Sequence, residues 1–333
     1  MVNTGIIITM AYPETIVMVA DEWYSPYLKY LGIGKKDYLR AGHAALVLIN
    51  KDRGELEYHD FGRYITKAPN GRVRGKKYDR ELDFPLKAVI ENNKIQNLNE
   101  ILLFLASNPE LTHGDGKLLA SICNEVDYEI AKKYISKMQR QGSIRYAAFK
   151  KNASNCARFV TTTLIAGVTN LKIRKKLISS QWFTPSTIGN VVLASSDGKV
   201  YEVTPNKVSQ FTSTVFRENR KYFLDRLKNY QVNLVGTIQS KDVKGLHKNT
   251  QWLSGIAAGA WYELTHEQIL ADNEFRMRRI SPYGNVDIDA VFKKAAGFDI
   301  GKEFKVIHNS NCAYCTVKQN GKIFCLEYLR DFN

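Results

Sequence analysis

Apolar residues near the start of the chain fall into short runs that predict β-strands. Residues 5–9 form a β-branched run that is typical of a strand. Residues 41–49 predict a buried strand, and a turn-forming segment separates it from a second strand over residues 55–64. The pattern therefore predicts a β-hairpin, which carries His43 at the start of its first strand and His59 in its second.

The middle of the chain is dominated by helical spacing. Apolar positions recur at intervals of three and four residues over 98–106, over 117–141 and again from 156 to 166. After the third of these segments, residues 188–194 predict a strand and residues 199–203 complete another hairpin.

Beyond about residue 205 the pattern changes. The expected elements are a charged helix over 215–230, a strand over 231–238, a helix over 287–296 and a terminal hairpin that turns at Asn320-Gly321. This change predicts an α+β protein with two domains, residues 1–205 and residues 206–333, and it gives the second domain no defined role.

Composition supports an ordinary globular protein. The 333 residues are 44% hydrophobic and 24% charged, enough to bury a sizeable core. The N-terminus lacks the pattern of a secretory signal, and no segment approaches the ~18 apolar residues of a transmembrane helix. Five cysteines, an odd number, favour a reducing compartment over a disulfide framework. We therefore expect a cytoplasmic protein.

The formal net charge of +15 favours anionic partners, such as nucleic acid or an acidic membrane surface. Basic runs occur at 72–77, 172–176 and 276–279, but acidic residues are mixed through the rest of the chain. We therefore interpret these runs as solvated faces with a general attraction for anions. The chain carries no recognised nucleic-acid-binding motif and no glycine-rich phosphate loop. The sequence leaves the oligomeric state open.

Candidate chemistry begins at Cys156. Ser154 and Asn155 are residues that cap helices, so the pattern places this thiol in the first turn of a helix. The free backbone N–H groups and the positive end of the helix dipole favour the thiolate there, which is the nucleophilic form of cysteine. The N–H of Cys156 itself is a candidate donor to an oxyanion.

A nucleophilic cysteine needs a base and a polar group that orients the base. His43 is the candidate base, and either His59 or Asp60 on the neighbouring strand could orient its ring. Residues 59 and 60 point to opposite faces of a strand, so at most one of them can do this. The pattern alone does not choose between them, and we prefer His59 because a second histidine there otherwise has no role.

These residues resemble a known group of proteins. The stretch Asn155-Cys156-Ala157-Arg158-Phe159-Val160 is similar to the Asn-Cys-x-x-Phe-Val motif of permuted papain-like proteins, which include lecithin:retinol acyltransferase relatives and permuted NlpC-like peptidases. Residues 42–47 and 58–60 are similar, in order and spacing, to the histidine strand and the next strand of that group, and Thr184-Pro185 to a segment after the cysteine helix. The whole chain resembles bacterial proteins of unknown function.

The resemblance implies a thiol hydrolase or acyltransferase acting on an amide or ester, with a permuted papain-like domain over residues 1–205. Cys156 would be the nucleophile, His43 the base and His59 the orienting residue. No cofactor is implied, and small-molecule, peptide and lipid acyl substrates all remain open. The alternative from another class is a non-catalytic protein of the same fold that binds an anionic partner.

A second cluster of potential ligands lies near the C-terminus. His308, Cys312, Cys315 and Cys325 could together hold a zinc ion. With a two-residue turn at Asn320-Gly321, however, Cys325 faces Thr316, and Cys315 and Cys325 then lie on opposite faces of the hairpin. This register favours buried structural thiols over a metal site.

Overall fold

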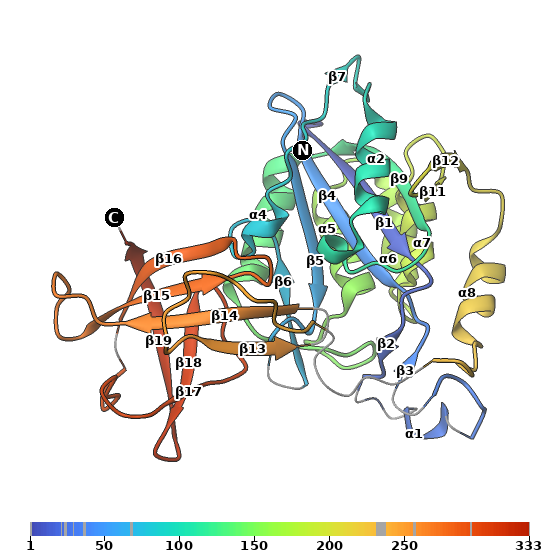
Figure 1. Ribbon diagram of the computed structural model, residues 1–333. Helices are drawn as coiled ribbons and strands as arrows, with labels where there is room; N and C mark the ends of the chain where they lie inside the picture. Colours follow the sequence, from blue (N-terminus) through green and yellow to red (C-terminus); the bar gives the residue numbers. More distant parts are fainter. Residues whose placement is uncertain are drawn as a thin grey trace. The chain divides into compact units, whose positions relative to one another are not determined.

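The computed structural model describes residues 2–20, 22, 25–28, 30–35, 38–66, 69–230, 238–255, 258–293 and 295–332 (Figure 1). The fold is mixed α+β, and the chain divides into two compact units. The first comprises Met1–Gly62, Arg72–Arg74 and Phe84–Val232, and the second comprises Arg63–Gly71, Gly75–Asp83 and Asn233–Asn333. The main division thus falls later than the expected boundary at residues 205/206.

An eight-stranded sheet forms the centre of the first unit. In spatial order its strands are β10 (Ile144–Arg145), β6 (Asn70–Arg74), β5 (Leu56–Gly62), β4 (His43–Asn50), β1 (Gly5–Tyr12), β9 (Leu118–Val126), β11 (Tyr201–Thr204) and β12 (Lys207–Gln210). Strand β1 is buried along its whole length, which suits its aliphatic residues on both faces of the sheet. The pairings of β1 with β4 and of β4 with β5 are antiparallel, so the predicted hairpin is confirmed.

Helices cover both faces of this sheet (Figure 1). The helices of the unit are α1 (Ser25–Leu28), α2 (Leu98–Ser107), α3 (Pro109–Thr112), α4 (Tyr128–Arg140), α5 (Cys156–Gly167), α6 (Leu171–Ser180), α7 (Thr187–Ala194) and α8 (Val215–Phe223). Helix α5 packs on β4 and β5, α7 packs on β1 and β9, and α8 packs on α7. Two short strand pairs complete the unit, β2 (Val17–Met18) with β3 (Tyr38–Leu39) and β7 (Ile90–Glu91) with β8 (Lys94–Ile95). Residues beyond 205 belong to this unit because β12 pairs with β11 and α8 packs on α7.

The second unit is built on a seven-stranded sheet. Its strands, in spatial order, are β13 (Gln251–Gly255), β14 (Ala258–Thr265), β15 (Glu274–Ile280), β16 (Val286–Lys293), β19 (Lys322–Asp331), β18 (Tyr314–Gln319) and β17 (Lys305–Val306), and a 3₁₀ turn spans Arg80–Leu82. Aromatic side chains, among them Phe275, Phe292 and Phe298, fill its core. Asn320 and Gly321 both have positive φ, as a two-residue hairpin turn requires, so the predicted terminal hairpin is confirmed.

Three expected elements differ from the structure. The single helix expected over 117–141 is β9 followed by α4, because Asp127 accepts a hydrogen bond from the Ile130 N–H at 3.1 Å and starts the helix there. The strand expected over 188–194 is α7, which Ser186 caps, and the helix expected over 287–296 is β16. Short apolar runs fit either periodicity, and packing decides between them. The strand expected over 231–238 falls mostly outside the described residues.

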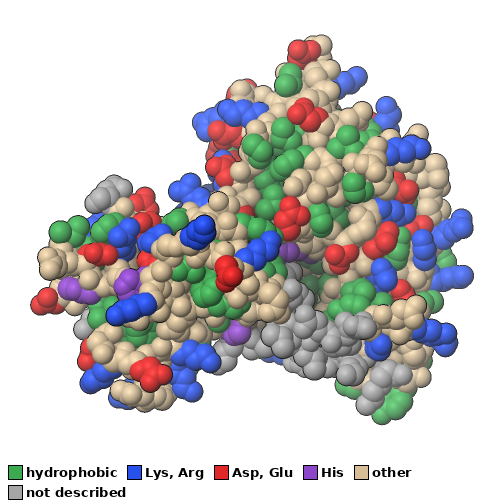
Figure 2. Space-filling view, in the orientation of Figure 1, with side chains coloured by type: hydrophobic (Ala, Val, Ile, Leu, Met, Phe, Trp, Pro, Cys, Tyr) green, Lys and Arg blue, Asp and Glu red, His purple; other side chains and the backbone are tan. Residues whose placement is uncertain are grey.

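Charged side chains of both signs are interspersed over the face seen in Figure 2. On that face the basic residues do not gather into a single patch. Within the described residues, no helix has both the length and the apolar character needed to cross a bilayer.

Candidate active site

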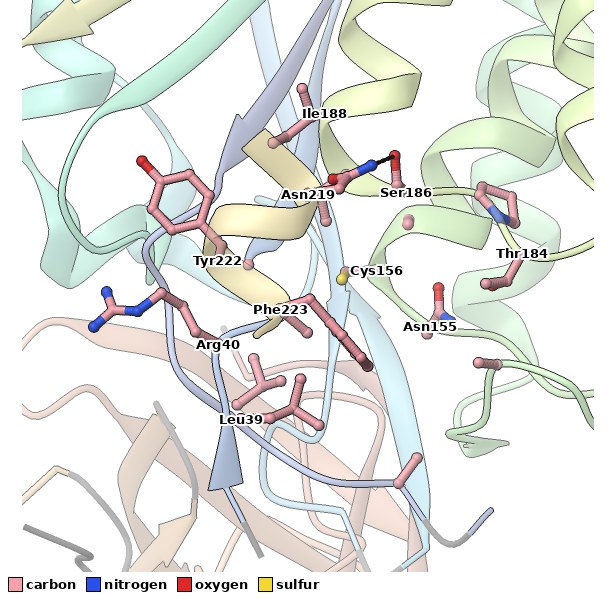
Figure 3. A pocket seen from close by; sticks show the side chains of 18 of the residues that line it. Leu39, Arg40, Asn155, Cys156, Thr184, Ser186, Ile188, Asn219, Tyr222 and Phe223 are labelled. Atoms are coloured by element: carbon pink, nitrogen blue, oxygen red, sulfur yellow. Dashed lines mark hydrogen bonds between the residues drawn. The ribbon is translucent and has the colours of Figure 1, made fainter. Parts of the chain in front are cut away.

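Cys156 is the first residue of α5, as the capping pattern predicted. The Asn155 side chain accepts a hydrogen bond from the Arg158 N–H at 2.8 Å, which caps the helix and fixes its start. The Cys156 sulfur lies at the wall of a cavity of about 790 Å³, into which it points in Figure 3. The thiol is thus held at the positive end of a helix and faces open space.

His43 begins β4 immediately after Gly42, whose φ of +75° lets the chain turn into the strand. A Cβ on Gly42 would lie 3.0 Å from the Tyr12 carbonyl oxygen and 3.1 Å from the Thr187 hydroxyl, so a side chain has little room there. His43 Nε2 lies 3.0 Å from Asp60 Oδ2. With Nε2 on the carboxylate, Nδ1 is the nitrogen available to the Cys156 thiol.

Asp60 is fully buried and anchored from several sides. Arg74 donates to both carboxylate oxygens, from Nε at 3.0 Å and from Nη2 at 2.6 Å. The Tyr58 hydroxyl also donates to Asp60, at 3.0 Å. Arg74 pairs directly opposite Asp60 in the β5–β6 register, so the sheet itself sets this bidentate contact.

The electrostatics favour an ion pair between thiolate and imidazolium. Burial by itself raises the pKa of Cys156, but the hydrogen bond and charge of His43 outweigh it, helped by the Ala44 backbone and Tyr146, and the pKa is lowered. Burial likewise lowers the pKa of His43, but its hydrogen bonds to Asp60 and Cys156 raise it to about 9. Burial raises the pKa of Asp60, but the charge of Arg74 and the hydrogen bond to His43 hold it well below its usual range.

Asp60, rather than the preferred His59, contacts the ring of His43. The register places Asp60 opposite Ala45 and His59 opposite Leu46, so Asp60 shares a face of the sheet with His43, and His59 lies on the other face. The His59 Nδ1 instead lies 3.1 Å from the Arg74 carbonyl oxygen. The choice depended on the register of the hairpin, which the sequence pattern left undefined.

Two residues of the site were missed by the sequence reasoning. Arg74 was placed in a basic run interpreted as a solvated face, yet it is 1% exposed and holds Asp60. Only the place of β6 beside β5 shows this role, and no strand was predicted over these residues. Tyr146, whose hydroxyl lies 4.0 Å from the Cys156 sulfur, follows a short strand and likewise gave no signal.

The four candidate zinc ligands lie in different places. Cys325 pairs with Thr316 and Cys315 pairs with Leu326, which is the register expected for the two-residue turn. His308 Nε2 contacts the Ser254 carbonyl oxygen at 2.8 Å, and the Cys312 thiol donates to a backbone carbonyl of the same unit. Among the residues that the structure describes, no group of three or more His, Cys, Asp or Glu side chains is arranged to hold a metal ion.

Comparison with known proteins places the chain in a family. The model of the type VI secretion system effector TseH-like family matches residues 7–173, half of the chain, a range that contains His43, Asp60 and Cys156. The chain belongs to this TseH-like family. In this TseH-like chain, residues 250–329 also match a second model, the DUF6695 C-terminal domain, and that match lies within the second unit.

One solved structure found to resemble the TseH-like chain is a crystal structure of the type VI secretion system effector TseH. It is 18% identical, with a TM-score of 0.37, and the match covers 63% of this chain and 99% of that chain. The search of curated proteins found no match.

Proposed function

We propose that the protein is a cysteine hydrolase or acyltransferase, of the permuted papain-like kind, that cleaves an amide or ester through a covalent acyl-enzyme. Cys156 is the nucleophile, His43 the acid and base, and Asp60 the residue that orients His43. The observation that carries the proposal is the contact chain from Arg74 through Asp60 and His43 to a cysteine that lines a cavity.

In the first step the Cys156 sulfur attacks the substrate carbonyl carbon and forms an Sγ–C bond. The negative charge that develops on the carbonyl oxygen is stabilised by the Cys156 backbone N–H, which lies in the helix turn where N–H groups lack intrahelical acceptors. The bond to the leaving oxygen or nitrogen then breaks, and His43 donates its proton to that atom.

In the second step water, or another hydroxyl or amine acceptor, attacks the thioester carbonyl. His43 takes the proton of this nucleophile, the Sγ–C bond breaks, and the thiolate returns to its pair with imidazolium. The buried Asp60 keeps the ring in one orientation throughout. Its pairing with Arg74 means that the carboxylate stays charged while the His43 proton moves.

Labelling with iodoacetamide, read by peptide mass spectrometry, tests the proposal without knowledge of the substrate. At pH 6–7 we expect Cys156 to be alkylated at least about tenfold faster than the exposed Cys325, because only the thiolate form of cysteine is alkylated. His43→Ala should remove this advantage, whereas His308→Ala, a histidine of the second unit, should not. Equal rates at the two cysteines, or no effect of His43→Ala, would overturn the proposal.

A further inference from the structure

The walls of the cavity at Cys156 are strongly apolar. Val17, Leu39, Ile188 and Phe223 line it from four different elements, as the close view shows for those it labels (Figure 3). Its volume of about 790 Å³ falls within the range of about 300–1,000 Å³ of small-molecule sites. This is far more space than a carbonyl carbon and a small substituent need, and apolar walls favour filling it with hydrocarbon.

Several polar side chains in the walls are already hydrogen-bonded to other protein groups. The Asn219 amide donates to the Ser186 hydroxyl at 3.1 Å (Figure 3), and Ser186 accepts from the Gly189 N–H at 2.8 Å. Arg40, a charged residue of the wall, donates to Asp225 at 2.9 Å and to the Glu14 carbonyl oxygen at 2.8 Å. Using these groups to bind a polar substrate would require breaking existing hydrogen bonds.

Two exposed aromatic residues lie at the rim of the cavity. Trp182 is 93% exposed and Phe183 is 76% exposed, and both line the cavity between α6 and α7. Large exposed apolar residues beside a pocket are typical of a binding surface. The preceding helix, α6, adds exposed Lys172, Lys175 and Lys176, a combination of cations and aromatic residues that suits an amphiphile.

We propose that the acyl group transferred to Cys156 is a long hydrocarbon chain, so that the substrate is a fatty-acyl ester or amide. This inference rests on the proposed function. The chain occupies the apolar cavity while Sγ forms the thioester bond to its carbonyl carbon. The alcohol or amine leaves with the proton from His43, and water then releases the free fatty acid.

A series of p-nitrophenyl esters from acetyl to decanoyl, used below their micelle concentrations, tests the chain-length dependence. We expect kcat/KM to rise about tenfold or more along the series, because each buried methylene contributes to binding in the transition state. The same acyl group presented in zwitterionic or anionic vesicles distinguishes the source of the chain. Faster cleavage in anionic than in zwitterionic vesicles identifies the substrate as a membrane lipid. Cleavage that is confined to dissolved esters identifies it as a soluble acyl ester.

Variants of α8 provide a matched control. Phe223 lines the cavity, whereas Phe216 lies on the same helix, is 76% exposed and does not line it. Phe223→Ala and Trp182→Ala should each lower the ratio of kcat/KM for the decanoyl ester to kcat/KM for the acetyl ester by about fivefold. Phe216→Ala should leave this ratio as it is in the wild type.

The outcomes separate the two proposals. A flat chain-length profile in a protein whose Cys156 still shows His43-dependent alkylation overturns the fatty-acyl inference and leaves the thiol mechanism standing. Cleavage of polar peptides with no cleavage of acyl esters likewise overturns the fatty-acyl inference and leaves the thiol mechanism standing. If the protein hydrolyses none of the esters and Cys156 is not alkylated faster than Cys325, both proposals fail.

Discussion

Each unit of the molecule buries an arginine and an aspartate close to a cysteine, and the two clusters differ in what the cysteine faces. In the first unit, Arg74 and Asp60 hold His43, and His43 contacts the thiol of Cys156 at a cavity wall. In the second unit, Arg279 pairs with Asp287 and lies 3.9 Å from the Cys312 sulfur.

The cysteine of the second unit's cluster is buried and hydrogen-bonded to the backbone. Cys312 is 1% exposed, and its S–H donates to the Tyr78 carbonyl oxygen. Donating to a carbonyl favours a proton on the Cys312 sulfur, whereas the contact of Cys156 with His43 favours loss of the proton. Cys156 contacts a histidine and lines a cavity, whereas Cys312 donates to a backbone carbonyl, and we expect this difference to set the relative reactivity of the two thiols.

Removing each thiol gives the largest expected contrast. Cys156→Ala should lower turnover by about 10⁴-fold or more, because no other group can form the acyl-enzyme. Cys312→Ala should leave kcat of the folded protein within about twofold. The measurement is turnover of the best ester, normalised to folded protein by circular dichroism. Comparable losses in both variants would remove the distinction between the clusters.

The histidine is the second point of difference. His43→Ala should lower kcat by about 10²–10⁴-fold, the usual contribution of general acid–base catalysis. It should also shift the apparent pKa for alkylation of Cys156 upward, since burial raises this pKa once the imidazolium is gone. In the wild type, turnover should fall as pH rises through about 9, because His43 then loses the proton that it gives to the leaving group.

Neutralising the aspartate of each pair tests what the clusters share. Asp60→Asn should destabilise the protein by about 3–5 kcal/mol, because it removes the carboxylate that pairs with the buried Arg74. Asp287→Asn should cost less, because Arg279 keeps a second carboxylate, that of Asp79, at 3.8 Å. Only Asp60→Asn should also slow alkylation of Cys156. Urea unfolding and labelling rates measure the two effects, and slowed alkylation in Asp287→Asn would contradict the comparison.

The Asp60 carboxylate makes the stability of the protein depend on pH in a defined direction. The pKa of Asp60 is depressed in the folded state, so its contribution to stability is complete above the unfolded value of about 3.9. This contribution is lost as pH falls from there toward the folded pKa. Asp60→Asn should therefore flatten the loss of stability below pH 4, as followed by the urea midpoint.

The exposed cysteine gives the smallest effect. Cys325→Ser should change stability by about 0.5 kcal/mol or less, since the residue lies at the surface. Partial burial raises the pKa of Cys325, so its alkylation rate should still be climbing at pH 9, where that of Cys156 has levelled off. Coincident pH profiles for the two thiols would show that Cys156 is not activated.

The sequence predicted the parts of the site that depend on local signals. Asn155 caps α5 directly before Cys156, and the turn between β4 and β5 lies between two clear apolar runs, so both elements were predictable. The choice of Asp60 over His59 depends on hairpin register, and the pairing of Arg74 depends on which strand lies beside β5. Residues 118–126 illustrate the same point, because only their place beside β1 shows that this apolar run is a strand.

His43 and Cys156 lie far apart along the chain, which has a consequence for the reactivity of the thiol during folding. His43 and Asp60 belong to one hairpin, whereas Cys156 reaches them only when α5 packs on β4 and β5. Before that closure the thiol lacks the imidazolium that lowers its pKa, so a nascent or partly unfolded chain carries a cysteine of ordinary reactivity. Completion of the tertiary structure thus lowers the pKa of Cys156, and any condition that separates α5 from the hairpin should raise it again.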